Sequence, residues 1–326
     1  MKRNPCEHCG IRNAIIKRPK TGQRVCKECF FELFENEVHE TIQNDHMFKR
    51  GQKVAIGASG GKDSTCLAYV LEKLNREHDY GLNLFLLSID EGIMGYRDGS
   101  LETVKQNAAD YHLPLQIISY KELFGYTMDE IVRQTCDSTG FTKACSYCGV
   151  FRRQALNIGA ERSQADLIAT GHNADDNAET VIMNLFRGDI NRLTRSSESS
   201  SSNFDSTSKR VVPRCKPLRY SLATLISRLC YQKEIVLYAH FKKLLYFSVE
   251  CSYAKFGYRG NMRQFLAKAQ LVRPEVVSNV IHASDWLWPA EGTTRKRPQA
   301  TSCKRCGYPC SQRVCQCSER CLLGCL

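Results

Sequence analysis

The chain has 326 residues, 42% hydrophobic and 25% charged, so it is long enough for one large or two ordinary globular domains. Its 46 lysines and arginines outnumber its 34 aspartates and glutamates, and the formal net charge of +12 favours a polyanionic partner such as nucleic acid. No apolar run reaches the roughly 18 residues of a membrane-spanning helix, and the start MKRNPCEHCG lacks the apolar core of a secretory signal, so we expect a cytoplasmic protein with no membrane partner.

The 18 cysteines of the chain include several CxxC pairs. Without a secretory signal, such pairs favour metal sites over disulfides. Near the start, Cys6-x-x-Cys9 and Cys26-x-x-Cys29 are separated by sixteen residues, a spacing typical of a tetrahedral Zn²⁺ site. His8 lies inside the first pair and is expected at the surface rather than on the metal. The expected role of the zinc is to hold a small ribbon together.

The central part of the chain alternates apolar runs with helical patterns. Four runs are typical of short buried strands, namely KVAIGA, LNLFLLSID, LPLQIISY and ADLIATG, which begin at residues 53, 82, 113 and 165. This alternation predicts βαβ units, and so an α/β fold with a parallel sheet and helices on both faces. In such sheets, ligands bind at the carboxyl ends of the strands.

A glycine-rich turn, SGGKDS, follows the first of these strands. It is not a Walker A loop, because Ile56 stands at the first glycine position and an aspartate follows the lysine, and it also lacks the GxGxxG spacing. Its glycines would let the backbone approach a phosphate at a helix start, and its acid would need Mg²⁺ beside that phosphate. The alternative is a plain strand-to-helix turn capped by Ser59. The residues expected to bind phosphate are Ser59, Gly60, Gly61, Lys62, Asp63 and Ser64.

The turn SGGKDS after a strand resembles the PP-loop of the ATP pyrophosphatases, a superfamily that cleaves ATP to AMP and pyrophosphate and so adenylates its substrate. The later stretch GHNADDNAET resembles the other nucleotide-binding motif of that superfamily. The resemblance implies that Gly171 and His172 contact the nucleotide. It also implies that Asp63 and Asp176 are catalytic and hold Mg²⁺ against the phosphates. On the residues alone, Asp175 and Asp176 could instead be first-turn acids favoured by a helix dipole.

A further pair, Cys145-x-x-Cys148, lies within the α/β region with no second CxxC nearby. By itself it could be a redox pair or half of a metal site. Cys251, in the stretch VECSYA, is a candidate distant third ligand. Three protein thiolates would leave one iron of a [4Fe-4S] cluster open to exogenous sulfur.

Taken together, the motifs are similar to those of the two-thiouridine tRNA sulfurtransferases of archaeal and eukaryotic type. They are the N-terminal CxxC pairs, SGGKDS, CSYCGVFRRQAL, GHNADD, ECSYA and a C-terminal CxxCGY. This resemblance implies that Cys145 and Cys148 are catalytic and bind an iron–sulfur cluster, expected to be [4Fe-4S]. Cys251 rather than Cys215 would be the third ligand. Arg152 would contact an ATP phosphate, whereas on the residues alone it could belong to a solvated helix face.

The same resemblance implies the reaction and its partners. The expected function is ATP-dependent 2-thiolation of the wobble uridine in cytosolic tRNAs, by adenylation of the base followed by sulfur transfer. Besides tRNA, the expected partners are a ubiquitin-like sulfur-carrier protein and a second, noncatalytic subunit. Two alternatives stay open: a PP-loop tRNA-modifying ligase that needs no cluster, and a noncatalytic zinc-ribbon subunit that binds tRNA without turning over ATP.

Composition divides the chain into five parts. They are a zinc ribbon and linker helix at 1–50, a PP-loop ATP-binding domain at 51–195, a serine-rich loop at 196–209, a continuation with helices and Cys251 at 210–290, and a Cys-rich tail at 291–326. Helical periodicity predicts helices over 233–247 and 261–272.

Two stretches depart from the family's pattern. The tail resembles a second zinc ribbon, in which Cys317 is one residue short of closing the pattern. The stretch SLATLISRLCYQ, at 221–232, is an insert between the nucleotide domain and Cys251. The candidate ligands of the tail are Cys303, Cys306, Cys315 and Cys317.

Overall fold

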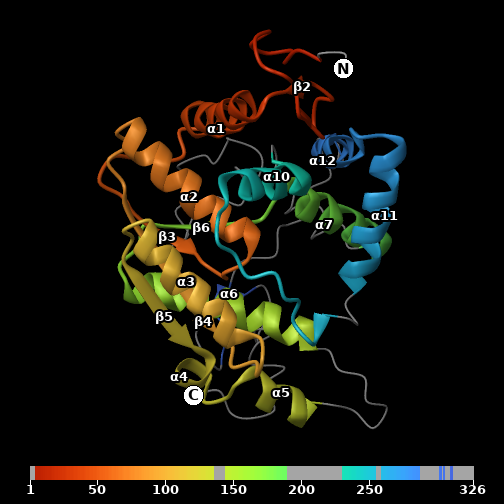
Figure 1. Cartoon of the computed structure of the whole chain (residues 1–326). Coiled ribbons are helices and arrows are strands. Elements are labelled where there is room, and N and C mark those ends of the chain that lie inside the picture. Colours follow the sequence, from red (N-terminus) through yellow and green to blue (C-terminus); the bar gives the residue numbers. More distant parts are fainter. Residues whose placement is uncertain are drawn as a thin grey trace, which may run out of the picture.

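The computed structural model describes the greater part of the chain. The described residues are 4–135, 144–188, 230–254, 258–286, 301–302, 304 and 309–310. The serine-rich loop and the four candidate ligands of the tail lie outside them. Within the described residues the chain forms an α/β body with a small N-terminal ribbon at one end (Figure 1). None of the helices in these ranges combines the length and the apolar character needed to cross a bilayer.

The centre of the body is a parallel sheet, as the sequence predicts. Its strands are β3 (Lys53–Gly57), β4 (Asn83–Asp90), β5 (Leu115–Ser119) and β6 (Leu167–Thr170), in the order β5-β4-β3-β6. Val54 in β3 is in register with Leu84 on one side and with Leu167 on the other. In chain order, β4 pairs with one edge of β3 and β5 then pairs with β4; β6 afterwards pairs with the other edge of β3. The loops after β3 and β6 therefore flank the topological switch point, where open α/β sheets bind ligands.

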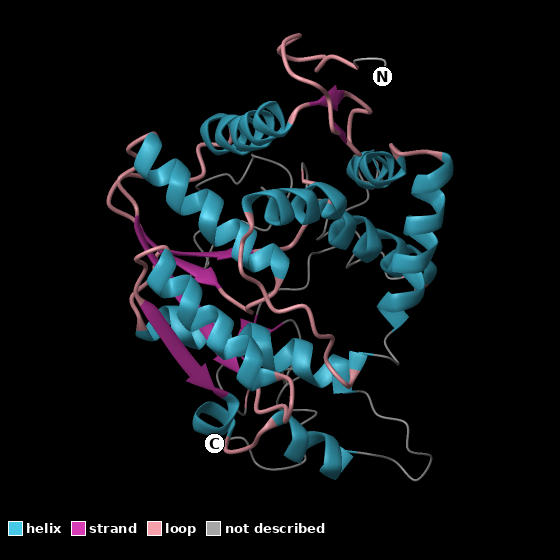
Figure 2. Ribbon diagram, viewed as in Figure 1, coloured by secondary structure: helices cyan, strands magenta, loops and turns pink. Residues whose placement is uncertain are grey.

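Helices cover both faces of the sheet (Figure 2). Side chains along β3 point alternately to the two faces of the sheet, so Val54 and Ile56 belong to one hydrophobic cluster and Ala55 to the other.

The predicted helix over 261–272 is confirmed as part of α11 (Tyr258–Val272). The helices are α1 (Lys27–Asn44), α2 (Lys62–Glu77), α3 (Arg97–Asp110), α4 (Tyr120–Phe124), α5 (Met128–Thr135), α6 (Ala144–Arg162), α7 (Ala174–Phe186), α10 (Gln232–Lys242), α11 (Tyr258–Val272) and α12 (Val276–Trp286).

The predicted helix over 233–247 is wrong in its last five residues. Helix α10 ends at Lys242, and Lys243 turns the chain with a φ of +57°. The apolar pattern predicts that the helix continues through LLYF, at 244–247. In the structure, the backbone N–H of Phe247 donates instead to the carbonyl of Gly60, 2.8 Å away. A tertiary contact thus overrides the local pattern. The end of the insert is part of the core, since Cys230 is only 1% exposed.

The N-terminal ribbon consists of the hairpin β1 (Ile16–Lys17) and β2 (Arg24–Val25), followed by α1. A short pair, β7 (Thr301–Ser302) and β8 (Pro309–Cys310), lies in the tail. The ribbon is tied to the α/β body by Arg18, whose guanidinium contacts the carboxylate of Glu234 in α10 at 3.0 and 3.1 Å. The boundaries of the five parts named above stay predictions.

Candidate functional site

The phosphate loop (residues 59–64) makes a sharp turn between β3 and α2. Gly60 has a φ of +77°, and a Cβ built there would lie 2.6 Å from the carbonyl oxygen of Ser100. Both features require glycine. The hydroxyls of Ser59 and Ser64 lie 3.0 Å apart, and Ser64 also accepts the backbone N–H of Ser59. These contacts hold the loop in a compact form at the end of β3.

Helix α2 starts without a side-chain cap in the part of the chain that the structure describes. Ser59 accepts the N–H of Gly61 within the loop, at 3.4 Å, rather than capping the helix. The first N–H groups of a helix have no partner within it, so this end of α2 offers donors to an anion. Lys62 Nζ lies 3.3 Å from Asp63 Oδ2, so each charge of the loop is partly balanced.

The GHNADD motif packs directly against the start of α2. A Cβ on Gly171 would lie 2.8 Å from the backbone of both Asp63 and Ser64, so this approach requires glycine. Asn173 caps α7 in a capping box with Asp176 and also donates its side-chain N–H to Asp63 Oδ1, at 3.1 Å. Sequence reasoning missed this bridge, although the place of Asn173 ahead of two acids is typical of a cap.

The two adjacent acids of the motif differ in environment. Asp175 is 8% exposed and accepts N–H groups from Gln232 and Gln270, which ties α10 and α11 to α7. Burial raises the pKa of Asp175. Asp176 is more exposed than Asp175 and has Arg259 Nη1 at 3.4 Å from its carboxylate. Asp175 thus ties three helices together. Asp176 instead shares a hydrogen-bond donor with Asp63, because Asn173 donates to both carboxylates.

Helix α11 adds two arginines that sequence reasoning missed. Arg259 donates to Thr180, and Arg263 donates to Glu179 at 2.9 Å. Glu179 is only 1% exposed. No local motif marks these arginines, because their partners lie far away in the sequence on α7.

His172 follows β6 directly. Its Nδ1 lies 2.9 Å from the hydroxyl of Thr170. Desolvation by the surrounding protein lowers the pKa of His172 below its ordinary value. The lowered pKa favours the neutral imidazole, which can donate or accept a hydrogen bond at this strand end.

Cys145, Cys148 and Cys251 lie in one region at the start of α6. Cys148 and Cys251 pack against the same hydrophobic cluster, and the Cys145 thiol donates to the carbonyl of Tyr253 at 3.3 Å. Desolvation, together with the neighbouring Cys148 and Cys251, raises the pKa of Cys145. Among the described residues, these three sulfurs do not all lie within 4.8 Å of one another. Three soft thiol donors in one region suit an iron–sulfur or other metal site.

Arg152 stands between these cysteines and a buried acid. Its Nη2 lies 2.9 Å from Glu91 Oε1 and 3.5 Å from Cys148 Sγ. The Glu91 side chain is 4% exposed, and its carboxylate raises the pKa of Arg152. Glu91 also lies 3.3 Å from Arg97. The Arg152 side chain is itself 44% exposed, but it also contacts a buried acid and a cysteine, which a wholly solvated arginine would not. Sequence reasoning missed Glu91, although it directly follows a predicted strand.

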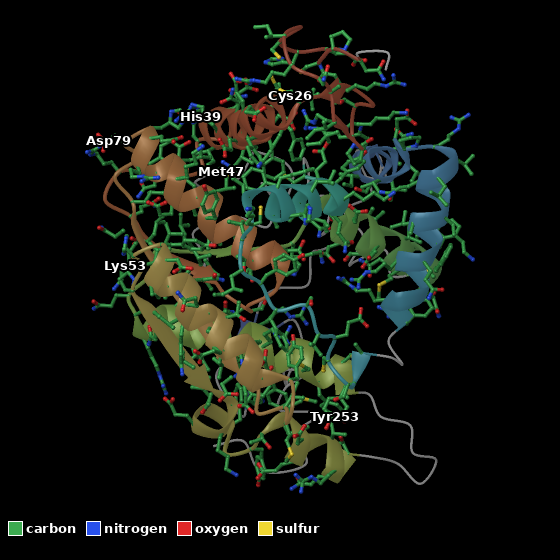
Figure 3. The ribbon with its side chains drawn as sticks, viewed as in Figure 1. Cys26, His39, Met47, Lys53, Asp79 and Tyr253 are labelled. Atoms are coloured by element: carbon green, nitrogen blue, oxygen red, sulfur yellow. The ribbon has the colours of Figure 1, made fainter. Side chains whose placement is uncertain are left out.

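The four cysteines of the ribbon form a separate cluster near one end of the molecule, where Figure 3 labels Cys26. Their sulfurs all lie within 4.8 Å of one another, as for ligands of a single tetrahedral ion. Burial would raise the pKa of Cys6, but backbone N–H donors of Cys9, Cys26 and His8 lower it to about 6, which favours the metal-binding thiolate. Among the described residues, the His8 ring lies within 4.8 Å of Cys29 and the exposed Glu32 but is not part of the set of four thiols.

Comparisons with known proteins cover most of the chain. Residues 32–209 match a family model described as a PP-loop domain. A protein of Danio rerio named cytoplasmic tRNA 2-thiolation protein 1 is 54% identical over 311 residues, covering 95% of this chain and 85% of the relative. The protein of that name from Dictyostelium discoideum is 52% identical over 310 residues, covering 95% and 81%. The solved structure of the U34-tRNA thiolase NcsA from Methanococcus maripaludis with its [4Fe-4S] cluster matches with a TM-score of 0.78 at 26% identity, covering 98% of this chain and 96% of that one.

Proposed function

Because the chain belongs to the family of the cytoplasmic tRNA 2-thiolation proteins, we propose that it uses ATP to replace the C2 oxygen of the wobble uridine in cytosolic tRNAs by sulfur. One observation carries this proposal: the phosphate loop and a three-cysteine site lie at the carboxyl ends of neighbouring strands. The loop follows β3, and Glu91, which follows β4, holds Arg152 beside Cys148. This placement supports one location for both halves of the reaction, at the carboxyl ends of β3 and β4.

In the first half, ATP lies with its phosphates in the phosphate loop. The uridine C2 oxygen attacks the α-phosphorus, the bond to the bridging oxygen breaks, and pyrophosphate leaves. Lys62 and the N–H groups of α2 balance the phosphate charge. Asp63 and Asp176 offer the oxygen ligands that Mg²⁺ prefers. Asn173 keeps both carboxylates in place, because its side-chain N–H donates to Asp63 and its backbone N–H donates to Asp176.

In the second half, a sulfur nucleophile attacks C2, the C2–O bond breaks, and AMP leaves. Cys145, Cys148 and Cys251 are suited to hold an iron–sulfur cluster, which when bound supplies an open iron for the incoming sulfur. Burial raises the pKa of Cys148, and Arg152, 3.5 Å from its sulfur, opposes that rise. Arg152 also offers positive charge to the departing phosphate.

Further parts of the proposal concern structure and partners. The four ribbon thiolates hold Zn²⁺ as a structural ion. The excess of lysines and arginines, which gives the net charge of +12, favours binding of the tRNA backbone. A ubiquitin-like protein delivers sulfur from a C-terminal thiocarboxylate, and a second, noncatalytic subunit assists in the cytoplasm. The exposure of Cys145 supports access by a protein donor.

A single assay tests the function. Anaerobically purified protein is given tRNA, ATP and sulfide, and the products are measured by chromatography. We expect 2-thiouridine and AMP, and we expect Cys145→Ser to form no 2-thiouridine. ADP as the product, or thiolation that does not depend on Cys145, would contradict the proposal. A cluster-free ligase would form AMP without thiouridine, and a noncatalytic subunit would bind tRNA without ATP turnover.

The close approach of Gly171 to α2 gives a prediction about ATP binding. Gly171→Ala places a methyl group 2.8 Å from the backbone of Asp63, so the loop must shift. We expect the dissociation constant for ATP to rise by about tenfold or more, which corresponds to about 1.4 kcal/mol. Isothermal titration calorimetry measures it. Gly149→Ala is the matched control, since a Cβ there meets nothing within 4 Å; equal affinities in the two variants would contradict the prediction.

A further inference from the structure

After α10 the chain crosses the molecule to reach the cysteine site. Lys243 adopts a φ of +57°, and the N–H of Leu244 donates to the carbonyl of Ala239 at 2.9 Å, which closes the helix. Residues 244–254, here called the crossing segment, then run past α3 toward α6, as the cyan trace below α10 in Figure 1. This segment carries the third cysteine, Cys251.

The first anchor of the crossing segment is on the phosphate loop itself. The backbone N–H of Phe247 donates to the carbonyl of Gly60 at 2.8 Å. The Phe247 ring fills the space above α3, where a Cβ on Gly99 would lie 2.5 Å from the ring. The ring also meets Tyr96 edge to face, with centroids 5.7 Å apart. Backbone and side chain thus both fix Phe247 beside the loop.

The second anchor is at the cysteine site. The carbonyl of Tyr253 accepts the thiol of Cys145 at 3.3 Å, and the Tyr253 hydroxyl donates to Asp129 at 2.8 Å. Figure 3 labels Tyr253 at this end of the molecule. Cys251 packs against the same hydrophobic cluster as Cys148. The end of the crossing segment is thus fixed by contacts with α5 and α6.

Four residue steps lead from Phe247 to Cys251, and six lead to Tyr253. An extended chain spans at most about 14 Å over four residues. Gly60 and Cys251 are therefore joined, through Phe247, by a short stretch of backbone along which a shift of the loop reaches the cysteine site.

We propose that Phe247 is a positioning residue that couples the phosphate loop to the third cysteine. Binding of ATP at the loop changes the placement and reactivity of Cys251, and loading of the cysteine site changes the affinity for ATP, because such coupling acts in both directions. The inference rests on the proposed assignment of ATP to residues 59–64, but its test requires no thiolation.

The test uses iron-free, reduced protein and measures alkylation of Cys251 by iodoacetamide, with and without ATP and Mg²⁺, by peptide mass spectrometry. In the wild type we expect ATP to change the alkylation rate by about fivefold or more. In Phe247→Ala we expect equal rates with and without ATP. Val249→Ala is the matched control, because Val249 lies in the same segment with its side chain 56% exposed; it should keep the wild-type response.

The outcomes separate this inference from the proposed function. A wild type that binds ATP but shows no change at Cys251 overturns the coupling and leaves the function standing. A wild type that does not bind ATP overturns the function. If Phe247→Ala melts early, Phe247→Leu replaces it: both variants keep the backbone N–H, and leucine also keeps part of the apolar contact with α3. A partial loss of the ATP response in Phe247→Leu supports the inference, and a full response in both variants overturns it.

Discussion

Replacing Arg152 by alanine is expected to lower the rate of tRNA thiolation by about 100-fold or more, the usual effect of removing a group that stabilises developing charge. Arg152 contacts both the buried carboxylate of Glu91 and the sulfur of Cys148. Its loss removes the positive charge beside that sulfur and leaves Glu91 with Arg97 alone. Steady-state kinetics with tRNA and ATP give kcat and KM, and iron analysis of each variant shows whether the cysteine site is still loaded.

The neighbouring Arg153 is the matched control, because it lies on the same helix and is exposed. Arg153→Ala should keep the wild-type rate. Arg152→Lys keeps the charge but not the planar fork that reaches two partners, so an intermediate rate is expected. Equal rates for Arg152→Ala and Arg153→Ala would show that Arg152 takes no part in the reaction.

The second large effect is on stability, at the join between the ribbon and the α/β body. Glu234→Ala should lower the free energy of unfolding by about 3 kcal/mol, because it leaves the buried guanidinium of Arg18 without its main partner. The side chains of Arg18 and Glu234 are 2% and 0% exposed. Arg18 keeps a contact with Glu37 at 2.7 Å, which limits the loss. Urea unfolding followed by circular dichroism measures the difference.

An ion pair of similar geometry serves as the control. Arg50 contacts Asp79 at 3.0 and 3.2 Å, but the two side chains are 68% and 79% exposed. Figure 3 labels Asp79 at the edge of the molecule. Asp79→Ala should therefore change stability by about 1 kcal/mol or less. A similar loss in both variants would show that burial does not set the contribution of the Arg18–Glu234 pair.

The strands and the phosphate loop could be predicted from the sequence because their signals are local. An apolar run between polar turns marks a buried strand, and SGGKDS marks the loop wherever it occurs. The order β5-β4-β3-β6 could not be predicted, since the pairing of β3 with β6 joins segments far apart in the chain. The family resemblance singled out Asp176, but the residues by themselves did not separate it from Asp175, because the two adjacent acids differ only in burial and partners.

The residues that sequence reasoning missed share one property. Glu91, Asn173, Arg259 and Phe247 all act through partners distant in sequence, so no spacing rule reveals them. The helix that was predicted to extend to residue 247 is wrong for the same reason. Its apolar end follows a helical period, but a contact with Gly60 decides its conformation.

The central place of β3 has a consequence for synthesis of the chain. β3 can pair with β4 soon after both leave the ribosome, but its other edge waits for β6, which begins at Leu167. In that interval the buried residues Val54 to Ile56 form an open edge, and open edges pair readily with other chains. Until β6 emerges, the nascent protein thus carries an unprotected strand edge beside a phosphate loop that still lacks its contacts with Gly171, Asn173 and Phe247.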